Sequence, residues 1–224
     1  MCGRFSLTSK ARRLRDHFGL AREPEDMVPH YNIAPTQPVL VIPNRTERLL
    51  RPARWGLIPH WANDTRIGQR LINVRNETLL SREGFRAALQ RRRCIIPADG
   101  FYEWQRDAAG RRVPYYIRRR DGEPLAFAGI WDVWRPAEGE PVASCAIVTT
   151  DANELIAPIH DRMPVILPAA AYDVWLSPVA HSPEELEHFL VPCPSEWLEL
   201  QRVSTHVNKP EHDDPQCIAP DDGE

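Results

Sequence analysis

The sequence predicts an α+β fold: a single domain, mainly antiparallel sheet curled toward a barrel, with short helices at its periphery. Two observations support this class. Five short strand patterns follow one another between residues 94 and 149, and turns at 107–110 and 121–122 join neighbouring strands as hairpins. Helical patterns are short and do not alternate with the strands, which disfavours a parallel α/β arrangement. The 224 residues are enough for one substantial core, and no internal repeat is present.

Local patterns predict the individual elements in order. A helix is expected over residues 10–18, capped by Thr8 or Ser9 and ended by Gly19, and Ser81 is expected to cap a second helix. The expected strands are 39–42, 48–50, 94–97, 100–106, 113–118, 125–131, 144–149, 164–167 and 203–207, with further short helices at 153–157, 169–176 and 183–190. The domain is expected to span residues 1–209, and the acidic segment 210–224 is expected to be a disordered tail.

Charge is distributed unevenly along the chain. Residues 1–135 carry 25 basic and 14 acidic side chains, a net charge of +11, whereas residues 136–224 carry 3 basic and 17 acidic side chains, a net charge of -14. Arginine supplies 26 of the 28 basic residues, and its planar guanidinium suits phosphate recognition. The N-terminal part is therefore expected to attract a polyanion. A GC-rich genome also explains the preference for arginine, but it does not explain the separation of signs.

Composition disfavours several classes of protein. No apolar run approaches the roughly 20 residues of a membrane span, and the N-terminus lacks the apolar region of a signal peptide, so a cytoplasmic protein without membrane contact is expected. The five cysteines are scattered and odd in number, which favours reduced thiols. No cysteines show the spacing of a zinc site, and His206 with His212 is too small a set for one, so neither a metal nor a cofactor is expected.

Cysteine at position 2 is the strongest indication of chemistry. Removal of Met1, which is usual before a small residue, would leave Cys2 with a free α-amine whose pKa lies near ~8 and a thiol near ~8.5. Such an aminothiol can condense with an aldehyde to a Schiff base and close a thiazolidine ring. The same pair could attack an acyl carbon, as N-terminal nucleophile hydrolases do. Cys2 alone is also explained by mere tolerance of methionine removal.

Three polar segments contain groups that this chemistry needs. Asn73 can hold an amine or a hydroxyl, and Arg75 shares its face if the segment is extended. Glu103 lies between Tyr102 and Trp104, where partial desolvation would raise the pKa of its carboxyl toward that of a general acid. His160 lies in a loop closed by prolines and can carry protons near neutral pH.

Each of these segments also has a purely structural interpretation. The first could be an edge strand with a polar outer face, the second a surface glutamate, and the third a loop with a simple ion pair between Asp161 and Arg162. Tryptophan and arginine also alternate around residues 54–61, a combination that suits single-stranded nucleic acid. Trp55 is assigned to the core, and the role of Trp61 stays open.

Taken together and in this order, the segments resemble the SOS response-associated peptidase (SRAP) family. The resemblance extends from Cys2 to about Asn208. It rests on MCGRF at 1–5, YNIAPT at 31–36, RWGLIP at 54–59, LINVRNET at 71–78, CIIPADGFYEW at 94–104, VTT at 148–150, IHDRMPVIL at 159–167 and VNK at 207–209. One such string is weak, whereas the set is highly specific.

The resemblance implies a protein that acts on abasic sites in single-stranded DNA. Family members form a thiazolidine crosslink through their N-terminal cysteine, which shields the lesion, and they are implicated in autocatalytic removal of their own initiator methionine. An autoprocessing cysteine peptidase with abasic-site lyase-like chemistry is therefore expected, in the nucleoid and as a monomer. By this resemblance Cys2 is the nucleophile, Asn73 holds its amine and the opened sugar, Glu103 helps open the deoxyribose ring, and His160 assists proton transfer.

The resemblance also implies contacts with DNA. Arg4 and Arg75 would contact phosphates that flank the lesion, and Arg82 is a further candidate. The chain departs from the pattern at one place: His60 and Trp61 stand where some members have paired tryptophans, and Trp61 is the candidate that remains to contact a base.

Two other functions fit parts of the same sequence. Class II glutamine amidotransferases also begin Met-Cys-Gly and use Cys2 as an N-terminal nucleophile, although their Asn-Gly-Glu-type segment and synthase domain are absent here. A noncovalent single-stranded DNA-binding module would explain the arginines and tryptophans without using Cys2.

Overall fold

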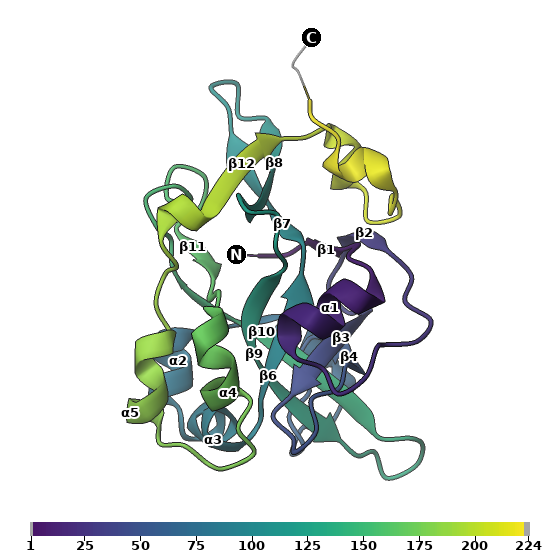
Figure 1. Ribbon diagram of the computed structural model, residues 1–224, viewed down its shortest axis with the longest axis vertical. Coiled ribbons are helices and arrows are strands. Elements are labelled where there is room, and N and C mark those ends of the chain that lie inside the picture. Colours follow the sequence, from purple (N-terminus) through teal and green to yellow (C-terminus); the bar gives the residue numbers. More distant parts are fainter. Residues whose placement is uncertain (1, 222–224) are drawn as a thin grey trace.

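A closed five-stranded barrel forms the centre of the fold (Figure 1). The computed structural model describes residues 2–221, so Met1, whose removal the sequence predicts, lies outside the described residues. The barrel strands are β3 (Pro38–Pro43), β4 (Arg51–Trp55), β6 (Arg93–Ala98), β9 (Leu125–Trp134) and β10 (Val142–Asp151). They pair in the order β10-β4-β3-β6-β9, and β9 also pairs with β10, which closes the ring. Only the β4–β10 pair within the ring is parallel, so the expected α+β class with a mainly antiparallel, curled sheet is confirmed.

Two short strands extend the barrel at one end of β10. β5 (Asn73–Arg75) lies parallel to β10, with Asn73 opposite Ile147. β11 (Arg162–Pro164) lies antiparallel to the end of the same strand, with Arg162 opposite Asp151. The polar segments around Asn73 and His160, about ninety residues apart in the chain, therefore meet along one strand.

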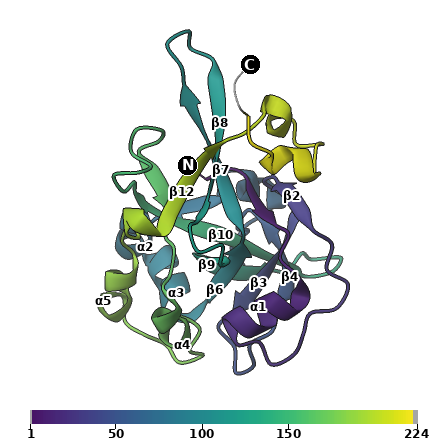
Figure 2. The same cartoon turned by 45° about the horizontal axis from the view of Figure 1, so that its top comes forward.

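A second sheet of five antiparallel strands carries the N-terminus. Its order is β12 (Leu198–Arg202), β8 (Arg112–Arg119), β7 (Gly100–Arg106), β1 (Phe5–Leu7) and β2 (His30–Ile33). β1 lies between β7 and β2, so the start of the chain is held inside the sheet (Figure 1). The hairpin of β7 and β8 projects beyond the rest of the sheet (Figure 2).

Aromatic packing joins the second sheet to the barrel. The ring of Phe5 lies 5.1 Å from that of Trp55 and 6.0 Å from that of Phe127. All three side chains are almost fully buried, which is where aromatic side chains contribute most to a core. The expected core position of Trp55 is confirmed, and the chain is anchored at Phe5, shortly after the predicted reactive residue Cys2.

Short helices cover the barrel. α1 (Ala11–Phe18) ends at Gly19, which adopts the left-handed conformation that glycine favours (φ 61°), as expected. The remaining α-helices are α2 (Asn76–Ser81), α3 (Glu83–Arg91), α4 (Tyr172–Trp175) and α5 (Pro183–Leu186), which gather at the left in Figure 1, and Tyr172 of α4 stacks on Phe18 of α1. Short 3-10 helices are Thr65–Gln69, Ala169–Ala171, Glu187–Phe189, Ser195–Trp197, Thr205–Asn208 and Pro215–Ile218. Among the described residues, no helix has the length and apolar character needed to cross a membrane.

Several local predictions differ from the structure. Thr8 and Ser9 do not cap α1, because the carboxylate of Asp99 binds both: Thr8 Oγ1 lies 3.0 Å and the Ser9 backbone nitrogen 2.7 Å from its Oδ2. Ser81 ends α2 instead of starting the next helix. The strand expected at 48–50 begins at Arg51. The strand expected at 203–207 is absent: β12 ends at Arg202, and a 3-10 helix begins at Thr205. The helix expected at 153–157 is replaced by turns over residues 154–159.

The C-terminal segment also differs from the expected disordered tail. Residues 211–221 fold back onto the second sheet. The carboxylate of Asp213 accepts a hydrogen bond from the backbone nitrogen of Asn32 at 2.9 Å, and Cys217 is fully buried. Val203 and Pro220 form an isolated β-bridge. The acidic composition predicted disorder because it does not show where the carboxylates bind. In the structure they accept hydrogen bonds from backbone nitrogens at the exposed edge of β2.

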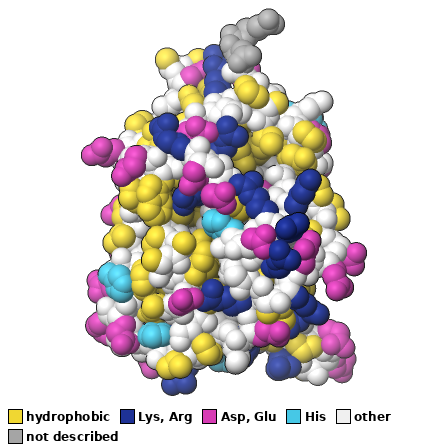
Figure 3. Space-filling model, viewed as in Figure 1, with side chains coloured by type: hydrophobic (Ala, Val, Ile, Leu, Met, Phe, Trp, Pro, Cys, Tyr) yellow, Lys and Arg dark blue, Asp and Glu magenta, His cyan; other side chains and the backbone are white. Residues whose placement is uncertain are grey.

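Part of the charge separation along the chain is used for ion pairs between the two parts. Basic and acidic side chains are interspersed on the face shown in Figure 3. Arginines of the first part pair with carboxylates of the second: Arg118 lies 2.8 Å from Glu199, and Arg86 lies 3.5 Å from Glu184. The sequence asymmetry thus contributes partly to internal ion pairing, and only the unpaired arginines remain to attract an anion.

Candidate active site

Cys2 lies buried shortly before β1 begins, beside β7. Phe5 pairs with Phe101, and the backbone nitrogen of Tyr102 donates to the carbonyl of Arg4 at 3.0 Å, so this register places residue 103 level with residue 3. The Cys2 side chain is fully shielded from solvent, and its Sγ lies 3.7 Å from the Arg4 carbonyl oxygen. Burial, reinforced by the negative charge of Glu103, raises the pKa of the Cys2 thiol, which is therefore neutral in the folded chain.

Asn73 is fixed against the backbone of Cys2. Its Nδ2 donates to the Cys2 carbonyl oxygen at 2.8 Å. The Oδ1 of the same amide is shielded from solvent and has no hydrogen-bond partner among the described residues. A shielded acceptor without a partner is energetically unfavourable, and such groups are common where a ligand binds. Asn73 thus holds Cys2 with one end of its amide and offers the other end to a donor.

Glu103 is buried at the same place. Its side chain is 4% exposed, and burial raises the pKa of its carboxyl above the ordinary value. The positive charge of His160 opposes this rise, whereas Asp161 adds to it. Because Glu103 also influences the Cys2 thiol, the three groups share one electrostatic environment. The expectation that Glu103 is partly desolvated agrees with its position.

His160 is presented by a tight loop between β10 and β11. The backbone nitrogen of Arg162 lies 3.0 Å from His160 Nδ1, and Gln105 of β7 donates to the carbonyl of Pro158 at 3.2 Å, which ties the loop to the strand that carries Glu103. The carboxylate of Asp161 lies 2.8 Å from the same Nδ1 and can pair with the imidazole when it is protonated. His160 is partly exposed and can exchange protons with solvent.

Two adjoining clefts open beside these residues, and we call them the Trp104 clefts. One, of about 650 Å³, is lined by Glu103, Trp104, Gln105, Arg106, Arg112, Pro158, Ile159 and His160. The other, of about 490 Å³, is lined by Gly3, Arg4, Pro35, Trp104, Arg112 and Asn208. Trp104 and Arg112 line both. An extended ligand could therefore pass from one cleft to the other across the start of β1.

The predicted DNA-binding residues occupy different surroundings. Arg4 is committed to the protein itself: its Nη1 donates to Asn32 Oδ1 at 2.8 Å and to the carbonyl of Val207 at 3.0 Å. Arg75, two residues after Asn73, is exposed and has no side-chain hydrogen bond or ion pair in the part of the chain that the structure describes. Arg82, also exposed, lies at the junction of α2 and α3.

The side chain of Trp61 is 63% exposed and therefore does not belong to the core. It lines a small hollow of about 40 Å³ with Pro59, Phe85 and Trp131, and none of the predicted catalytic residues lines that hollow. The structure therefore brings Cys2 together with the other three predicted catalytic residues but places Trp61 in a separate environment.

Sequence reasoning missed a buried group that links two of the motifs, which we call the Arg162 network. Arg162 is 6% exposed, and its guanidinium contacts Glu77, Asp151, Asn76 and the carbonyl of Thr149 at 2.7–3.1 Å. The simple loop pair of Asp161 with Arg162 is therefore wrong. Hydrogen bonding to Arg162 lowers the pKa of the Glu77 carboxyl. The sequence signal was present, because Glu77 belongs to the same polar segment as Asn73.

Trp104 and Arg112 were also missed as residues of the site. Trp104 was considered only as a neighbour of Glu103, and Arg112 was one arginine among many. The indole Nε1 of Trp104 donates to Asn208 Oδ1 at 2.7 Å, which turns one ring edge toward the C-terminal segment. The register of the β7–β8 hairpin, in which Arg106 faces Arg112, is what brings Arg112 to the clefts.

Comparisons with known proteins agree with this arrangement of motifs. The family model described as SOS response associated peptidase (SRAP) matches residues 1–210. The chain belongs to the SRAP family. It is 42% identical to the abasic site processing protein YoqW of Bacillus subtilis, over 97% of this chain and 99% of that protein. It is also 33% identical to the abasic site processing protein HMCES of Gallus gallus, over 98% of this chain and 78% of that protein.

Solved structures of other proteins show the same fold. A crystal structure of a protein from Bacteroides thetaiotaomicron is similar with a TM-score of 0.88 and 27% sequence identity, covering 98% of this chain and all of that one. A protein from Bordetella bronchiseptica gives a TM-score of 0.79 and 31% identity, covering 91% of this chain and all of that one. The resemblance seen in the sequence is therefore confirmed at the level of family and fold.

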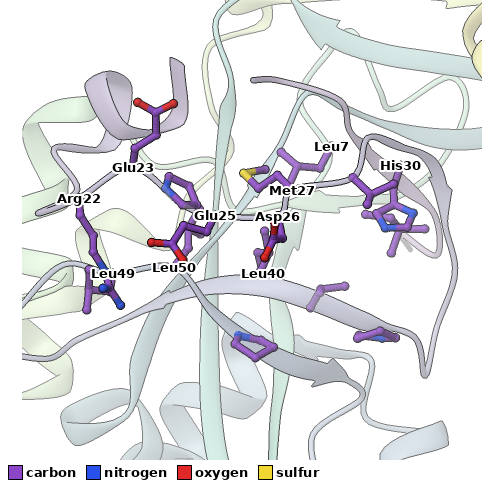
Figure 4. A pocket seen from close by; sticks show the side chains of 16 residues that line it. Leu7, Arg22, Glu23, Glu25, Asp26, Met27, His30, Leu40, Leu49 and Leu50 are labelled. Atoms are coloured by element: carbon purple, nitrogen blue, oxygen red, sulfur yellow. The ribbon is translucent and has the colours of Figure 1, made fainter. Parts of the chain in front are cut away.

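A separate hollow of about 360 Å³ lies under the loop between α1 and β2 (Figure 4). Leu7, Met27 and Leu40 line it together with the acidic side chains of Glu23 and Asp26. It contains none of the predicted catalytic residues of this SRAP protein. Its carboxylates would also repel a phosphate backbone, so we do not assign it to the active site.

Proposed function

We propose that this protein processes abasic sites in single-stranded DNA by forming a covalent thiazolidine crosslink through Cys2 once Met1 has been removed. The observation that carries the proposal is the hydrogen bond of 2.8 Å from Asn73 Nδ2 to the Cys2 carbonyl, beside the carboxyl of Glu103, which interacts electrostatically with both Cys2 and His160. The names of the relatives, which are abasic site processing proteins, support the same substrate.

The first chemical task is to open the sugar. Abasic deoxyribose exists mainly as a closed hemiacetal, so a proton must reach the ring oxygen before the aldehyde is released. Glu103 suits this task because burial raises the pKa of its carboxyl and keeps more of it protonated near neutral pH. The shielded Oδ1 of Asn73 can accept a hydrogen bond from the amine of Cys2 or from a hydroxyl of the opened sugar.

The second task is to capture the aldehyde. The neutral α-amine of Cys2 adds to the aldehyde carbon and loses one water, which gives a Schiff base. The thiol then adds across the C=N bond: sulfur bonds to carbon, and the thiol proton ends on nitrogen. The raised pKa of Cys2 does not oppose this step, because the neutral thiol supplies both the sulfur and the proton. His160, at the partly exposed side of the site, is placed to relay protons while water leaves.

The third task is to position the strand. Arg75, exposed on β5 beside Asn73, and Arg112, shared by the Trp104 clefts, provide cations for the flanking phosphates. Arg4 acts differently from the expectation, because its hydrogen bonds to Asn32 and Val207 hold the start of β1 in place. We propose that it shapes the site and meets phosphate only at its exposed edge. We expect the protein to act as a monomer in the nucleoid.

A denaturing gel tests the proposal directly. Wild-type protein is incubated with a single-stranded oligonucleotide in which uracil glycosylase has created one abasic site. A band that survives SDS and heat is expected, and Cys2→Ala should abolish it. Cys2→Ser should also lose the stable band, because oxygen closes a far more labile oxazolidine. A noncovalent DNA-binding module would give no band with any variant, and an unchanged band with Cys2→Ala would exclude Cys2 as the nucleophile.

A further inference from the structure

Three metal-ligating side chains cluster in the C-terminal segment, outside the catalytic residues. His206, Asp214 and Cys217 each offer one donor atom, and the three atoms lie within 4.8 Å of one another. His206 Nε2 lies 2.9 Å from Asp214 Oδ2. We propose that these three side chains form a binding site for one Zn²⁺ ion.

The spacing of the donor atoms is close to that of a tetrahedral zinc site. With Zn–N and Zn–O bonds of about 2.1 Å and a Zn–S bond of about 2.3 Å, such a site holds its donors roughly 3.3–3.6 Å apart. His206 and Asp214, now joined by a hydrogen bond, need to separate by only a few tenths of an ångström to admit the ion. Since no pair exceeds 4.8 Å, the sulfur is at most about 1.2 Å too distant.

The exposure of two of the three side chains suits closure around an ion. Cys217 is fully buried with Tyr102 and Tyr116, and its Sγ lies 3.3 Å from the carbonyl oxygen of His212, which holds the sulfur in place. The side chains of His206 and Asp214 are 24% and 45% exposed, and they can rotate toward the sulfur. The same exposure provides the path by which an ion enters from solvent.

Neighbouring contacts already orient the two movable ligands. Asp214 Oδ1 accepts a hydrogen bond of 2.8 Å from the backbone nitrogen of Gln216, and Asp214 Oδ2 faces His206. His212 Nδ1 lies 2.7 Å from the His206 carbonyl oxygen, and the two imidazole rings stack 3.8 Å apart. Metal ligands are commonly held by such outer contacts.

The chemistry of the donors selects the ion. One sulfur, one imidazole and one carboxylate form a borderline-soft set that suits Zn²⁺ and disfavours Mg²⁺ and Ca²⁺, which require oxygen ligands. Three protein ligands leave the fourth position to water. The sequence did not indicate this site because His206 and His212 were considered alone, whereas the fold brings His206 to Asp214 and Cys217.

Zinc at this position would stiffen one wall of the Trp104 clefts. The ligands bracket Val207 and Asn208, which accept hydrogen bonds from Arg4 and from the indole of Trp104. An ion bound to this segment would therefore fix the position of the Val207 carbonyl, to which Arg4 donates a hydrogen bond. The site itself does not depend on the proposed DNA chemistry.

Zinc titration of the purified, reduced full-length protein tests the proposal. Zinc chloride is titrated in competition with a chromophoric chelator, and thermal unfolding is followed with and without zinc. One equivalent of Zn²⁺ is expected to bind and to raise Tm, because an ion that binds only the folded state stabilises it. Magnesium chloride at the same concentration should leave Tm unchanged.

Matched variants separate the site from general binding. Cys217→Ala and Asp214→Asn should each weaken zinc binding at least about tenfold. Asparagine keeps the hydrogen bond to Gln216, so Asp214→Asn should still fold. Cys193→Ala removes another buried thiol and should bind zinc as the wild type does. The proposal is overturned if wild-type protein binds no zinc and shows no rise in Tm, or if Cys217→Ala and Asp214→Asn bind zinc as tightly as wild type.

Discussion

The Arg162 network and the Trp104 clefts both contain arginine beside carboxylate groups, and they differ in how the arginine is used. Arg162 is 6% exposed, and both of its terminal nitrogens are hydrogen-bonded to protein groups. Arg112 is exposed and makes no side-chain hydrogen bond or ion pair within residues 2–221. The first arginine therefore holds two motifs together, whereas the second remains available to an external anion.

This difference shows which charges can act on DNA. A buried guanidinium whose terminal nitrogens are all hydrogen-bonded to protein cannot reach a phosphate without breaking the fold. Arg4, which the family motif suggested as a phosphate contact, resembles this case because it is hydrogen-bonded to Asn32. Arg75 and Arg112 keep their charge exposed. We therefore expect chemistry, stability and DNA encounter to depend on separate residues, and four changes test that separation.

The largest effect is expected from Glu103→Gln. Glutamine keeps the size of the side chain but cannot donate the proton that opens the sugar, so the crosslinking rate should fall by about 10²–10⁴-fold. The rate is measured from single-turnover time courses on denaturing gels. Glu77→Gln, in the Arg162 network, is the control for loss of a carboxylate that is not in the clefts. A rate for Glu103→Gln within a factor of two of wild type would remove Glu103 from the mechanism.

The pH dependence of the rate gives a second test of Glu103. Reaction needs a neutral amine and a protonated carboxyl. The rate should therefore rise with pH at low pH, as the amine loses its proton, and fall above the amine pKa near ~8, where further alkalinity only ionises Glu103. Glu103→Gln should keep the rise and lose the fall. An identical fall in both proteins would assign it to another group.

The Glu103 carboxyl is expected to promote crosslinking but to lower the stability of the fold when it ionises. Burial raises the folded-state pKa of Glu103 above its unfolded value near ~4.3, so its ionisation lowers the free energy of unfolding as pH rises through the raised pKa. Glu103→Gln removes that cost. Urea unfolding should therefore show that the free energy of unfolding of Glu103→Gln increases relative to that of wild type between pH 4 and pH 8, although the variant is less active.

Arg162→Met should destabilise the fold by about 1–3 kcal/mol, because it leaves the buried Thr149 carbonyl without its donor and removes the hydrogen bonds that join α2 to β11. Arg112→Met, at an exposed position, should change the free energy of unfolding by less than about 0.5 kcal/mol. Urea unfolding measures both. Equal effects of the two variants would contradict the distinction between the two regions.

The smallest effect is expected from Arg112→Gln, on binding alone. The Cys2→Ala protein, which cannot crosslink, is titrated with an oligonucleotide that contains a stable abasic analogue. Loss of one phosphate contact should weaken binding several-fold and reduce the slope of log K against log salt by about 0.7. Arg111→Gln is the matched control, because Arg111 is adjacent but pairs with Asp107 at 2.7 Å. Equal salt slopes for the two variants would exclude a phosphate contact at Arg112.

The sequence predicted the barrel class and the four catalytic candidates because those features depend on local pattern. The run of hairpins from residue 94 onward shows in alternation and turns, and Cys2, Asn73, Glu103 and His160 each stand in a distinctive segment. Their convergence also followed from the family resemblance. What the residues alone could not give is the parallel pairing of β5 with β10, which brings Asn73 to Cys2.

The remaining errors come from long-range contacts. Asp99 takes the hydroxyls that looked like helix caps, and Asp213 docks a segment that looked disordered. Arg4 and Arg162 looked like surface cations, yet their partners lie up to two hundred residues away in the chain. These distant partners decide whether an arginine stabilises the fold or remains available to a ligand, and the local sequence pattern does not predict them.

Intact mass spectrometry of the protein after incubation with an abasic oligonucleotide tests the central claim most directly. The account predicts a chain that lacks Met1 and gains the mass of the oligonucleotide less one water, with no gain for Cys2→Ala. A chain that retains Met1 and still gains this mass, or one that lacks Met1 and never gains it, would contradict the account.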